Sequence, residues 1–180
     1  MIDSKEFFEQ LLEGYRSNYD IVRHDENEEG LVAEAHMHIV ESQCVVFKEF
    51  SMWTADADEY VYIYKVPHLT EEFAKNAIKE AYDDGFPKID LEHVNISKQH
   101  MRTNLVALFI CDSADEAAIK AVKKCKIYKS FQFSLKGWME MHTDLVTLND
   151  EKVYTNRYGT RTAEFLKMHI RHYNKLKAGM

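Results

Sequence analysis

The sequence has few of the residues that interrupt or cross-link a chain. Six Gly and two Pro occur among 180 residues, which excludes a collagen-like or disordered chain and leaves little room for flexible linkers. The three cysteines, Cys44, Cys111 and Cys125, are odd in number and form no CxxC pair. This usage is typical of reduced thiols in a cytosolic protein and not of a disulfide framework.

Long apolar runs and an excess of positive charge are also missing. No stretch approaches the roughly 18 consecutive apolar residues of a membrane span. The N-terminal segment MIDSKEFFEQLLEGY is amphipathic and acidic, unlike a signal peptide. The formal net charge of −7 would repel a phosphate backbone. We therefore expect a cytoplasmic protein, and we expect neither nucleic acid nor a membrane as a partner.

The composition that remains is that of an ordinary globular protein. The hydrophobic fraction is 46% and the charged fraction is 29%. A chain of this length can bury a sizeable core without disulfides or metals. Because no composition break, internal repeat or low-complexity tract interrupts it, we predict one globular domain spanning residues 1–180.

Apolar periodicity and turn residues predict the order of helices and strands. Helices are expected at about 3–16, 70–85, 113–124 and 160–177, and strands at about 19–24, 31–40, 43–53, 59–66, 101–112, 126–150 and 152–157. Within 126–150 a bend is predicted at Lys136-Gly137. Residues 54–58 are predicted to form a turn, Pro67 to end a strand, and Ser113 to Glu116 to form a capping box.

Two strand–helix–strand passages, around 59–112 and 101–133, permit parallel crossovers. This order indicates an α+β fold: a single mixed, mostly antiparallel sheet with about four helices packed on it.

The segment GLVAEAHMHIVE, residues 30–41, alternates between polar and apolar side chains. A strand would place Glu34, His36 and His38 on one face. The opposite face would then carry Leu31, Ala33, Ala35, Met37 and Ile39. Two imidazoles and a carboxylate in this spacing suit Zn, Mn or Fe. The same alternation is also produced by the solvated face of an antiparallel sheet. A metal site, a solvated face and ligand binding without a metal therefore all stay open.

A second polar row occurs in WMEMHTD, residues 138–144, where Glu140, His142 and Asp144 alternate with apolar side chains. If this strand lay beside strand 31–40, the two rows could converge into a cluster for a metal or for acid–base chemistry. The candidate metal ligands are therefore His36, His38, Glu34 and His142. We expect no cofactor, with Zn or Mn as the alternative.

Two further features are candidates for ligand binding. Tyr60, Tyr62 and Tyr64 share one face of a predicted strand, where they either line a pocket or pack beneath a helix. Arg157 precedes the last predicted helix, whose N-terminus could hold an anion. The alternative for Arg157 is an ordinary turn at the start of a helix.

No complete catalytic motif is present. The sequence contains no P-loop, GxGxxG or GxSxG. The spacing of Gly30, His36 and His38 matches only the first part of a cupin motif. The Asp-x-Lys and Asp-Glu-Lys matches of a nuclease fall at Asp3 and Asp150, where a helix start and a turn are predicted. Nuclease-like folds are therefore a structural analogy only, and the catalytic residues are unknown.

Three segments resemble an uncharacterised bacterial domain family of unknown function: EYVYIYKVPHLTEE, KKCKIYKSFQFSLKGW and TNRYGTRTAEFLK. The resemblance implies a compact cytosolic α+β domain and transfers no catalytic residue. Together these observations predict a non-enzymatic binding domain of the bacterial cytosol, whose partner is a small molecule or a protein. The alternative is a metal-dependent hydrolase or metal sensor built on His36 and His38.

Overall fold

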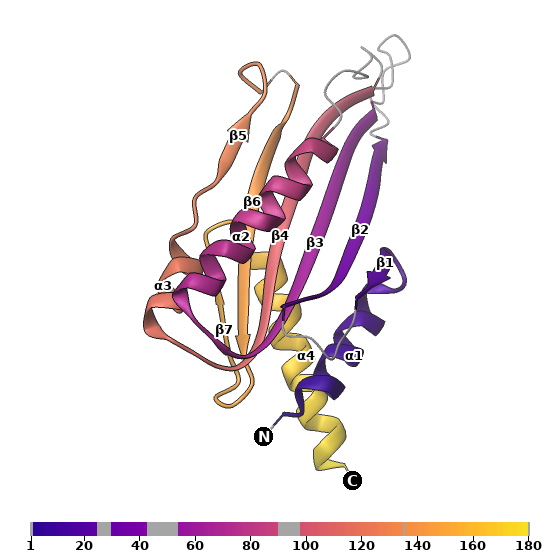
Figure 1. Ribbon diagram of the computed structural model, residues 1–180. Helices are drawn as coiled ribbons and strands as arrows, with labels where there is room; N and C mark the ends of the chain where they lie inside the picture. The colour runs from indigo at the N-terminus through magenta and orange to yellow at the C-terminus, as the bar shows by residue number, and fades with distance from the viewer. Residues whose placement is uncertain (1, 25–29, 43–53, 90–97, 135, 180) are drawn as a thin grey trace.

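The structure of the chain is a computed structural model that describes residues 2–24, 30–42, 54–89, 98–134 and 136–179 (Figure 1). For residues 39–42, 54–56 and 98–101 it describes the backbone alone. The strand predicted at 43–53, with Cys44, lies outside the described residues, and so does most of the loop predicted after Pro87.

Seven described strands form one sheet. They are β1 (Asp20–Arg23), β2 (Gly30–Ser42), β3 (Thr54–Leu69), β4 (Lys98–Ala114), β5 (Tyr128–Ser130), β6 (Trp138–Thr147) and β7 (Lys152–Thr155). Their order is β1-β2-β3-β4-β6-β5, and β7 also pairs with β6. The pairs β3–β4 and β4–β6 are parallel, whereas β1–β2, β2–β3, β5–β6 and β6–β7 are antiparallel. The predicted mixed, mostly antiparallel sheet is therefore confirmed.

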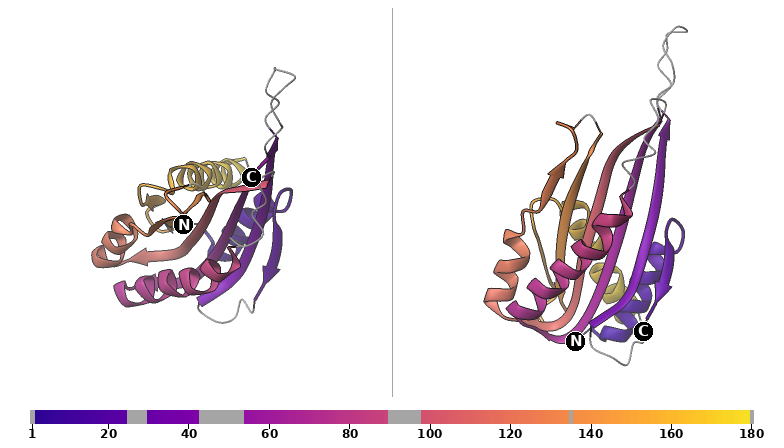
Figure 2. Two further views of the ribbon diagram at one scale, coloured as in Figure 1. Left: turned by 90° about the horizontal axis from the view of Figure 1, so that it is seen from above. Right: turned by 45° about the horizontal axis from the view of Figure 1, so that its top comes forward.

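Four α-helices cover the two faces of this sheet. They are α1 (Ser4–Tyr15), α2 (Glu71–Gly85), α3 (Glu116–Lys124) and α4 (Thr160–Ala178). Helices α2 and α3 lie on one face, and α1 and α4 lie on the other (Figures 1 and 2). The predicted α+β fold is thus confirmed as three layers with the sheet in the middle.

Helix α2 makes the crossover between the parallel strands β3 and β4, as the segment 59–112 predicted. The second predicted crossover differs in detail. After α3 the chain forms the short strand β5, which pairs antiparallel with β6, and it is β6 that lies parallel to β4. The predicted bend between β5 and β6 is present, and Gly137 adopts a φ of +81° there, a value that glycine reaches without strain.

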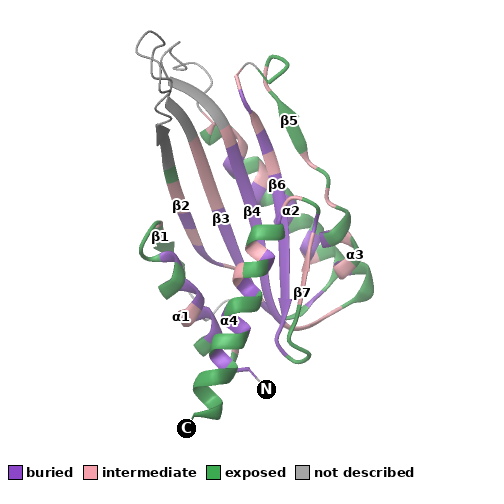
Figure 3. Cartoon of the chain, turned by 180° about the vertical axis from the view of Figure 1, so that it is seen from behind, coloured by how far each residue is buried: buried purple, intermediate pink, exposed green. Residues whose placement is uncertain are grey.

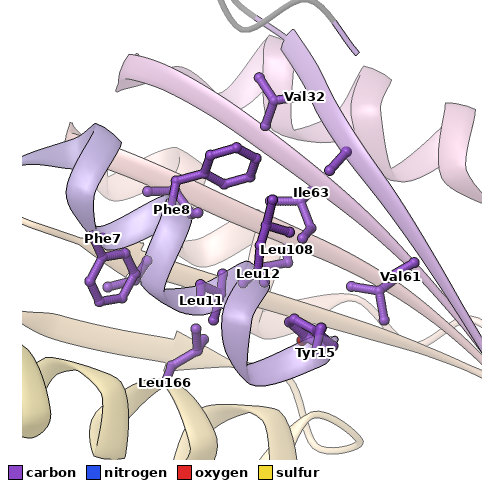
Figure 4. Close-up of a cluster of buried hydrophobic side chains, with 14 of the residues drawn as sticks. Phe7, Phe8, Leu11, Leu12, Tyr15, Val32, Val61, Ile63, Leu108 and Leu166 are labelled. Atoms are coloured by element: carbon purple, nitrogen blue, oxygen red, sulfur yellow. The ribbon is translucent and has the colours of Figure 1, made fainter. Parts of the chain in front are cut away.

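The α1/α4 face carries one of two apolar cores (Figure 4). The Asp3 side chain caps α1 by accepting a hydrogen bond of 2.8 Å from the Glu6 N–H. The helix then presents Phe7, Phe8, Leu11, Leu12 and Tyr15 to the sheet at helical spacing. These side chains pack on Val61, Ile63, Val106 and Leu108 and meet Leu166 of α4.

The α2/α3 face carries the second core. Tyr62 and Tyr64 of β3 are buried there beside Leu105 and Phe109 of β4. Opposite them, α2 contributes mainly small side chains: Ala74, Ala77, Ile78 and Ala81. Small residues on the helix let it approach a sheet face that carries large aromatic rings.

Strand β3 is longer at both ends than its sequence predicts. Residues 54–58 are not a turn, because they pair with β2 on one side and with β4 on the other, and tertiary pairing overrides weak local propensity. The strand also continues past Pro67 to Leu69. Strand β2 pairs with β3 only as far as Lys65, so Pro67 needs no N–H on that side.

The capping box predicted before α3 is wrong. Asp115 is the N-cap without a side-chain hydrogen bond, and Ser113 still belongs to β4.

Candidate functional site

A pocket lies on the α1/α4 face of the sheet, where α1 ends and α4 begins; Figure 3 shows both helices on this face. Its volume is about 330 Å³. The sheet contributes Met37, Glu59, Arg102, Asn104, Glu140 and His142; α1 and the turn after it contribute Gly14, Tyr15, Asn18 and Tyr19; and the start of α4 contributes Tyr158, Arg161, Thr162 and Phe165. The pocket therefore combines aromatic walls with a polar floor.

Strand register explains why polar side chains meet on this floor. Met37, Glu59, Asn104 and Glu140 are register partners across β2, β3, β4 and β6, so they form one row. The row containing His142 lies one step further along the sheet, beside Val106 and Val61. The apolar core under α1 thus gives way to polar rows where the helix ends.

Gly14 lets the two helices meet beside the pocket. A Cβ atom at this position would lie 2.8 Å from Nε2 of His169 and 3.0 Å from Cζ of Phe165, both on α4. A larger residue in this place would push α1 and α4 apart. The wall of the pocket therefore depends on a small residue in the last turn of α1.

A hydrogen-bonded chain fixes the orientation of Asn104. The Tyr19 hydroxyl donates to Glu59 Oε1 at 2.6 Å, and Asn104 Nδ2 donates to Glu59 Oε2 at 2.8 Å. Burial, together with the nearby Glu59 charge, raises the pKa of Tyr19, so its hydroxyl keeps its proton. With its amide nitrogen engaged, Asn104 leaves its Oδ1 atom buried without a hydrogen-bond partner.

His142 presents a second unpartnered atom. The residue is 6% exposed, and its Nε2 atom makes no hydrogen bond. Glu140 Oε2 lies 3.7 Å from that nitrogen, which is too long for a hydrogen bond. Burial lowers the pKa of His142 even though Glu59 and Glu140 oppose the shift, so the imidazole is neutral at neutral pH.

Asp144 lies two residues further along β6 and is fully buried. Neither carboxyl oxygen has a hydrogen-bond partner of normal geometry. The hydroxyls of Thr155 and Thr162 only partly offset the desolvation, and burial raises the pKa of Asp144 to about 7. The start of α4 passes directly over this group: a Cβ atom on Gly159 would lie 2.5 Å from Asp144 Oδ1. Glycine is therefore required at this position.

Asn156 holds the entry to α4. Its Nδ2 atom donates to Met141 O at 2.7 Å and to Cys125 O at 3.2 Å. Its Oδ1 atom accepts from the N–H groups of Tyr158 and Gly159. Arg157, the predicted anion ligand, is exposed, packs over the Tyr158 ring at 5.1 Å and is not among the residues that line the pocket. Asn156 thus forms a turn at the entry to α4, and anion binding by Arg157 stays a prediction.

The predicted histidine row lies on the opposite face of the sheet. His36 is partly exposed and His38 is exposed, whereas Ala33 and Ala35 on the other side of β2 are buried. The predicted alternation is therefore confirmed over these residues. Leu31 departs from it and packs with the α2/α3 core, because the register of β2 shifts between Leu31 and Ala33. The side chain of Ile39 lies outside the described residues.

Both imidazoles of this row bind one carboxylate oxygen. His36 Nε2 lies 3.0 Å and His38 Nδ1 lies 2.9 Å from Oδ1 of Asp58. Glu34 instead contacts His24 at 3.0 Å and Lys88 at 3.5 Å. Asp58 was not identified from the sequence, because its segment was predicted to form a turn.

The two polar rows do not converge. Strands β3 and β4 separate β2 from β6, and register places Glu34 on the face of Tyr62 but His142 on the face of Val106. Within the described residues no group of three or more His, Cys, Asp or Glu side chains is arranged to hold a metal ion. Metal binding by His36 and His38 stays a prediction, and His142 cannot join them.

The three tyrosines lie on the helix-covered face. The Tyr62 hydroxyl donates to Asp84 Oδ2 at 2.7 Å, and the Tyr64 hydroxyl donates to Ala77 O at 3.1 Å. Tyr60 stacks on His36 with ring centroids 4.3 Å apart. Two of the three thus belong to a filled core, which counts against a ligand pocket at this place.

Sequence reasoning missed most of the pocket floor. Glu59 and Asn104 are the polar residues at which two strongly apolar runs begin, EYVYIYKV and NLVALFICD. A polar residue beside a buried strand segment is the signal that could have identified them, because buried polar groups are uncommon and need a partner. Which strands lie side by side is set by tertiary contacts and could not be read from these runs.

Comparison with known proteins gives a family but no activity. None of the described helices has the length and apolarity needed to cross a membrane. Searches of curated proteins and of solved structures each gave no significant match. A family model described as "Domain of unknown function (DUF8052)" matches residues 3–168. Since the match covers nearly the whole chain, the chain belongs to this family of uncharacterised domains.

Proposed function

We propose that this chain is a non-enzymatic binding domain of the bacterial cytosol, and that it holds a small molecule in the pocket between α1, α4 and the sheet. The observation that carries the proposal is the pair of unpartnered atoms on the floor, Asn104 Oδ1 and His142 Nε2. A buried polar atom without a partner costs about 1–3 kcal/mol. A ligand that hydrogen-bonds to both atoms recovers that free energy.

The shape and lining of the pocket support the same proposal. Small-molecule sites combine apolar and aromatic walls with a few convergent polar groups. Here Tyr15, Tyr158 and Phe165 supply aromatic surface, and Met37 supplies apolar surface. The volume of about 330 Å³ is at the low end for such sites and suits a small metabolite.

A thermal-shift screen with a metabolite library tests this function. We expect at least one compound to raise the Tm of the wild type, because a ligand at about 100 times its Kd stabilises the folded state by about 2.7 kcal/mol. The shift should disappear in His142→Gln and persist in His38→Gln, which changes an exposed histidine on the opposite face. Stabilising compounds that act equally on both variants and on Asn104→Leu would bind elsewhere and would refute the proposal.

A metal site at His36 and His38 is a second candidate. The supporting observation is that both imidazoles meet the same oxygen of Asp58, at 3.0 Å and 2.9 Å. Imidazole and carboxylate ligands suit Zn or Mn, and such a site would make the chain a metal sensor or a metal-dependent hydrolase. The rings would have to turn, since the described side chains do not form a three-ligand group as they stand.

Elemental analysis of protein purified without a His tag distinguishes the two candidates. A metal site requires stoichiometric Zn or Mn in the wild type and its loss in the double variant His36→Ala/His38→Ala. His142→Gln should leave the metal content unchanged, because His142 faces the other side of the sheet. Wild-type protein with neither bound metal nor a Zn-dependent rise in Tm would eliminate the second candidate.

A further inference from the structure

Two arginines reach the pocket without an ion-pair partner. Arg102 comes from β4 and Arg161 from the first turn of α4, and both line the pocket. Neither guanidinium group makes a hydrogen bond or an ion pair within the part of the chain that the structure describes. In contrast, Arg16 pairs with Glu13 at 2.8 Å and Arg23 pairs with Glu9, both outside the pocket. An arginine pair left open in a pocket of a chain with net charge −7 indicates that the counter-charge comes from a ligand.

Neither carboxylate of the pocket pairs with these two arginines. Both oxygens of Glu59 accept hydrogen bonds, one from Tyr19 and one from Asn104, and turning this carboxylate toward an arginine would break them. Glu140 Oε2 lies 3.7 Å from His142 Nε2, beyond hydrogen-bond distance, and it forms no ion pair with either arginine in the part of the chain that the structure describes. In this arrangement the acids of the pocket therefore do not supply the missing anion.

The position of Arg161 adds a second argument. The first turn of α4 contains no acidic residue, and Gly159 caps the helix without a side-chain hydrogen bond. A cation at a helix N-terminus is unfavourable, whereas an anion there is stabilised. Asp144 lies against the inner side of this turn but is fully buried, so the outer side that faces the pocket stays positive.

We infer that the ligand of this pocket carries an oxyanion, carboxylate or phosphate, held by Arg102 and Arg161, together with an N–H or O–H donor for Asn104 Oδ1. The inference rests on the proposed binding function and specifies its chemistry. The planar guanidinium group matches both oxyanions through paired hydrogen bonds. The donor follows from the orientation of Asn104, whose nitrogen is engaged by Glu59 and whose oxygen is open.

Amide NMR titrations with four small probes test this chemistry. β-Alanine combines a carboxylate with an ammonium donor, and O-phosphoethanolamine combines a phosphate with the same donor. Ethanolamine lacks the oxyanion and propionate lacks the donor. We expect one or both of the first two probes to shift the resonances of Asn104 and Arg161 at millimolar concentration, and the stronger of the two identifies the oxyanion. Ethanolamine should cause no shift, and propionate a weaker one.

Variants connect the binding to the two arginines. Arg102→Gln/Arg161→Gln should weaken binding of the active probe by about tenfold or more, since hydrogen bonds to charged groups are lost. Arg171→Gln is the matched control, because this exposed arginine on α4 donates to Lys167 O outside the pocket. If the double variant does not fold, Arg161→Gln alone, at an exposed position, still reports on the inference.

Several results would overturn the inference. They are the absence of any shift with both oxyanion probes, equal shifts with ethanolamine, or unchanged affinity in the arginine variants. The binding function would still hold if one of these results occurred and the thermal-shift screen found a compound without an oxyanion that binds through His142. If no compound bound in the pocket at all, both the binding function and the oxyanion inference would be refuted.

Discussion

At the scale of single residues, Asp144 is an ionisable group that the fold removes completely from water. Its carboxyl group is fully buried beneath the first turn of α4, and its oxygens lack hydrogen-bond partners of normal geometry. Ionising such a group inside a protein is costly. The folded chain therefore holds a proton at Asp144 under conditions in which the unfolded chain has released it.

This difference makes stability depend on pH. The pKa of Asp144 rises from 3.8 to about 7 on folding, so between these values the folded state binds more protons and stability falls as pH increases. The loss amounts to on the order of 4 kcal/mol above pH 7 and vanishes below about pH 4. Asp144→Asn should remove this dependence. Urea unfolding at about pH 5 and about pH 8 measures it, and an equal pH response in both proteins would contradict the burial of the charge.

Gly159 gives a second prediction at this scale. Gly159→Ala would bring a methyl group within 2.5 Å of Asp144 Oδ1 and 2.3 Å of Thr155 Oγ1, and overpacking of this kind costs roughly 1–3 kcal/mol. The matched change Gly179→Ala places its Cβ no closer than 3.6 Å to another atom and should be neutral. Thermal unfolding of the two variants tests the difference. A stable Gly159→Ala protein would show that the start of α4 can move away from β6.

At the scale of elements, α1 depends on burial of one face. Asp3 caps the helix, and Phe7, Phe8, Leu11, Leu12 and Tyr15 form its inner face. Isolated helices of this length are marginal in water, so α1 owes its stability to packing. The Tyr173 hydroxyl adds a link from α4, because it donates to Glu6 Oε2 at 2.6 Å and accepts from the Asp3 N–H at 3.1 Å.

Leu11→Ala tests this dependence. The Leu11 side chain is fully buried between α1 and the sheet, so its removal should cost about 2–5 kcal/mol. Leu176→Ala is the control, because Leu176 on α4 is 49% exposed and its loss should cost less than about 0.5 kcal/mol. Equal costs in denaturant titrations would mean that α1 is not docked as described.

The sequence predicted elements well where local patterns dominate. The four helices follow from apolar stripes and caps such as Asp3 and Thr70, whose side chains accept the expected hydrogen bonds. The alternation of β2 follows from the two-residue period around His36. The extension of β3 through Pro67 could not be predicted, because it depends on where β2 stops and on pairing with β4.

The difference between local patterns and tertiary contacts also explains which residues of the candidate site the sequence did not predict. His142 was identified as a polar residue of interest from its strand period, but its neighbours were not. Glu59 and Asn104 join it only because β3, β4 and β6 are adjacent and in one register. Parallel neighbours are far apart in sequence, and no local rule predicts which residues share a row.

At the scale of the whole molecule, the prediction of one domain over residues 1–180 can be tested through a thiol. Cys111 lies in the central strand β4 and is 1% exposed, and burial raises the pKa of its thiol to about 12. A buried, protonated thiol does not react. In a Cys44→Ser/Cys125→Ser background, labelling of Cys111 should therefore require global unfolding.

We expect the denaturant midpoint for Cys111 labelling to coincide with that for loss of circular dichroism from the helices, as in a two-state transition. Labelling that begins well before the helices unfold would show that the sheet and the helices do not form one cooperative unit. Cys125, which is only partly buried, serves as the comparison: as the sole cysteine in a Cys44→Ser/Cys111→Ser protein, it should be labelled before the global transition.

The contact between α1 and α4 has a consequence for synthesis on the ribosome. Tyr173 lies 170 residues after the Asp3 N–H that it binds, and both ends of the described chain lie on the same side of the molecule (Figure 1). At about 5–20 residues per second, α1 emerges many seconds before its helical neighbour is translated. During this interval the apolar face of α1 has to be covered by the nascent sheet or by a chaperone, because α4 has not yet been synthesised to pack against it.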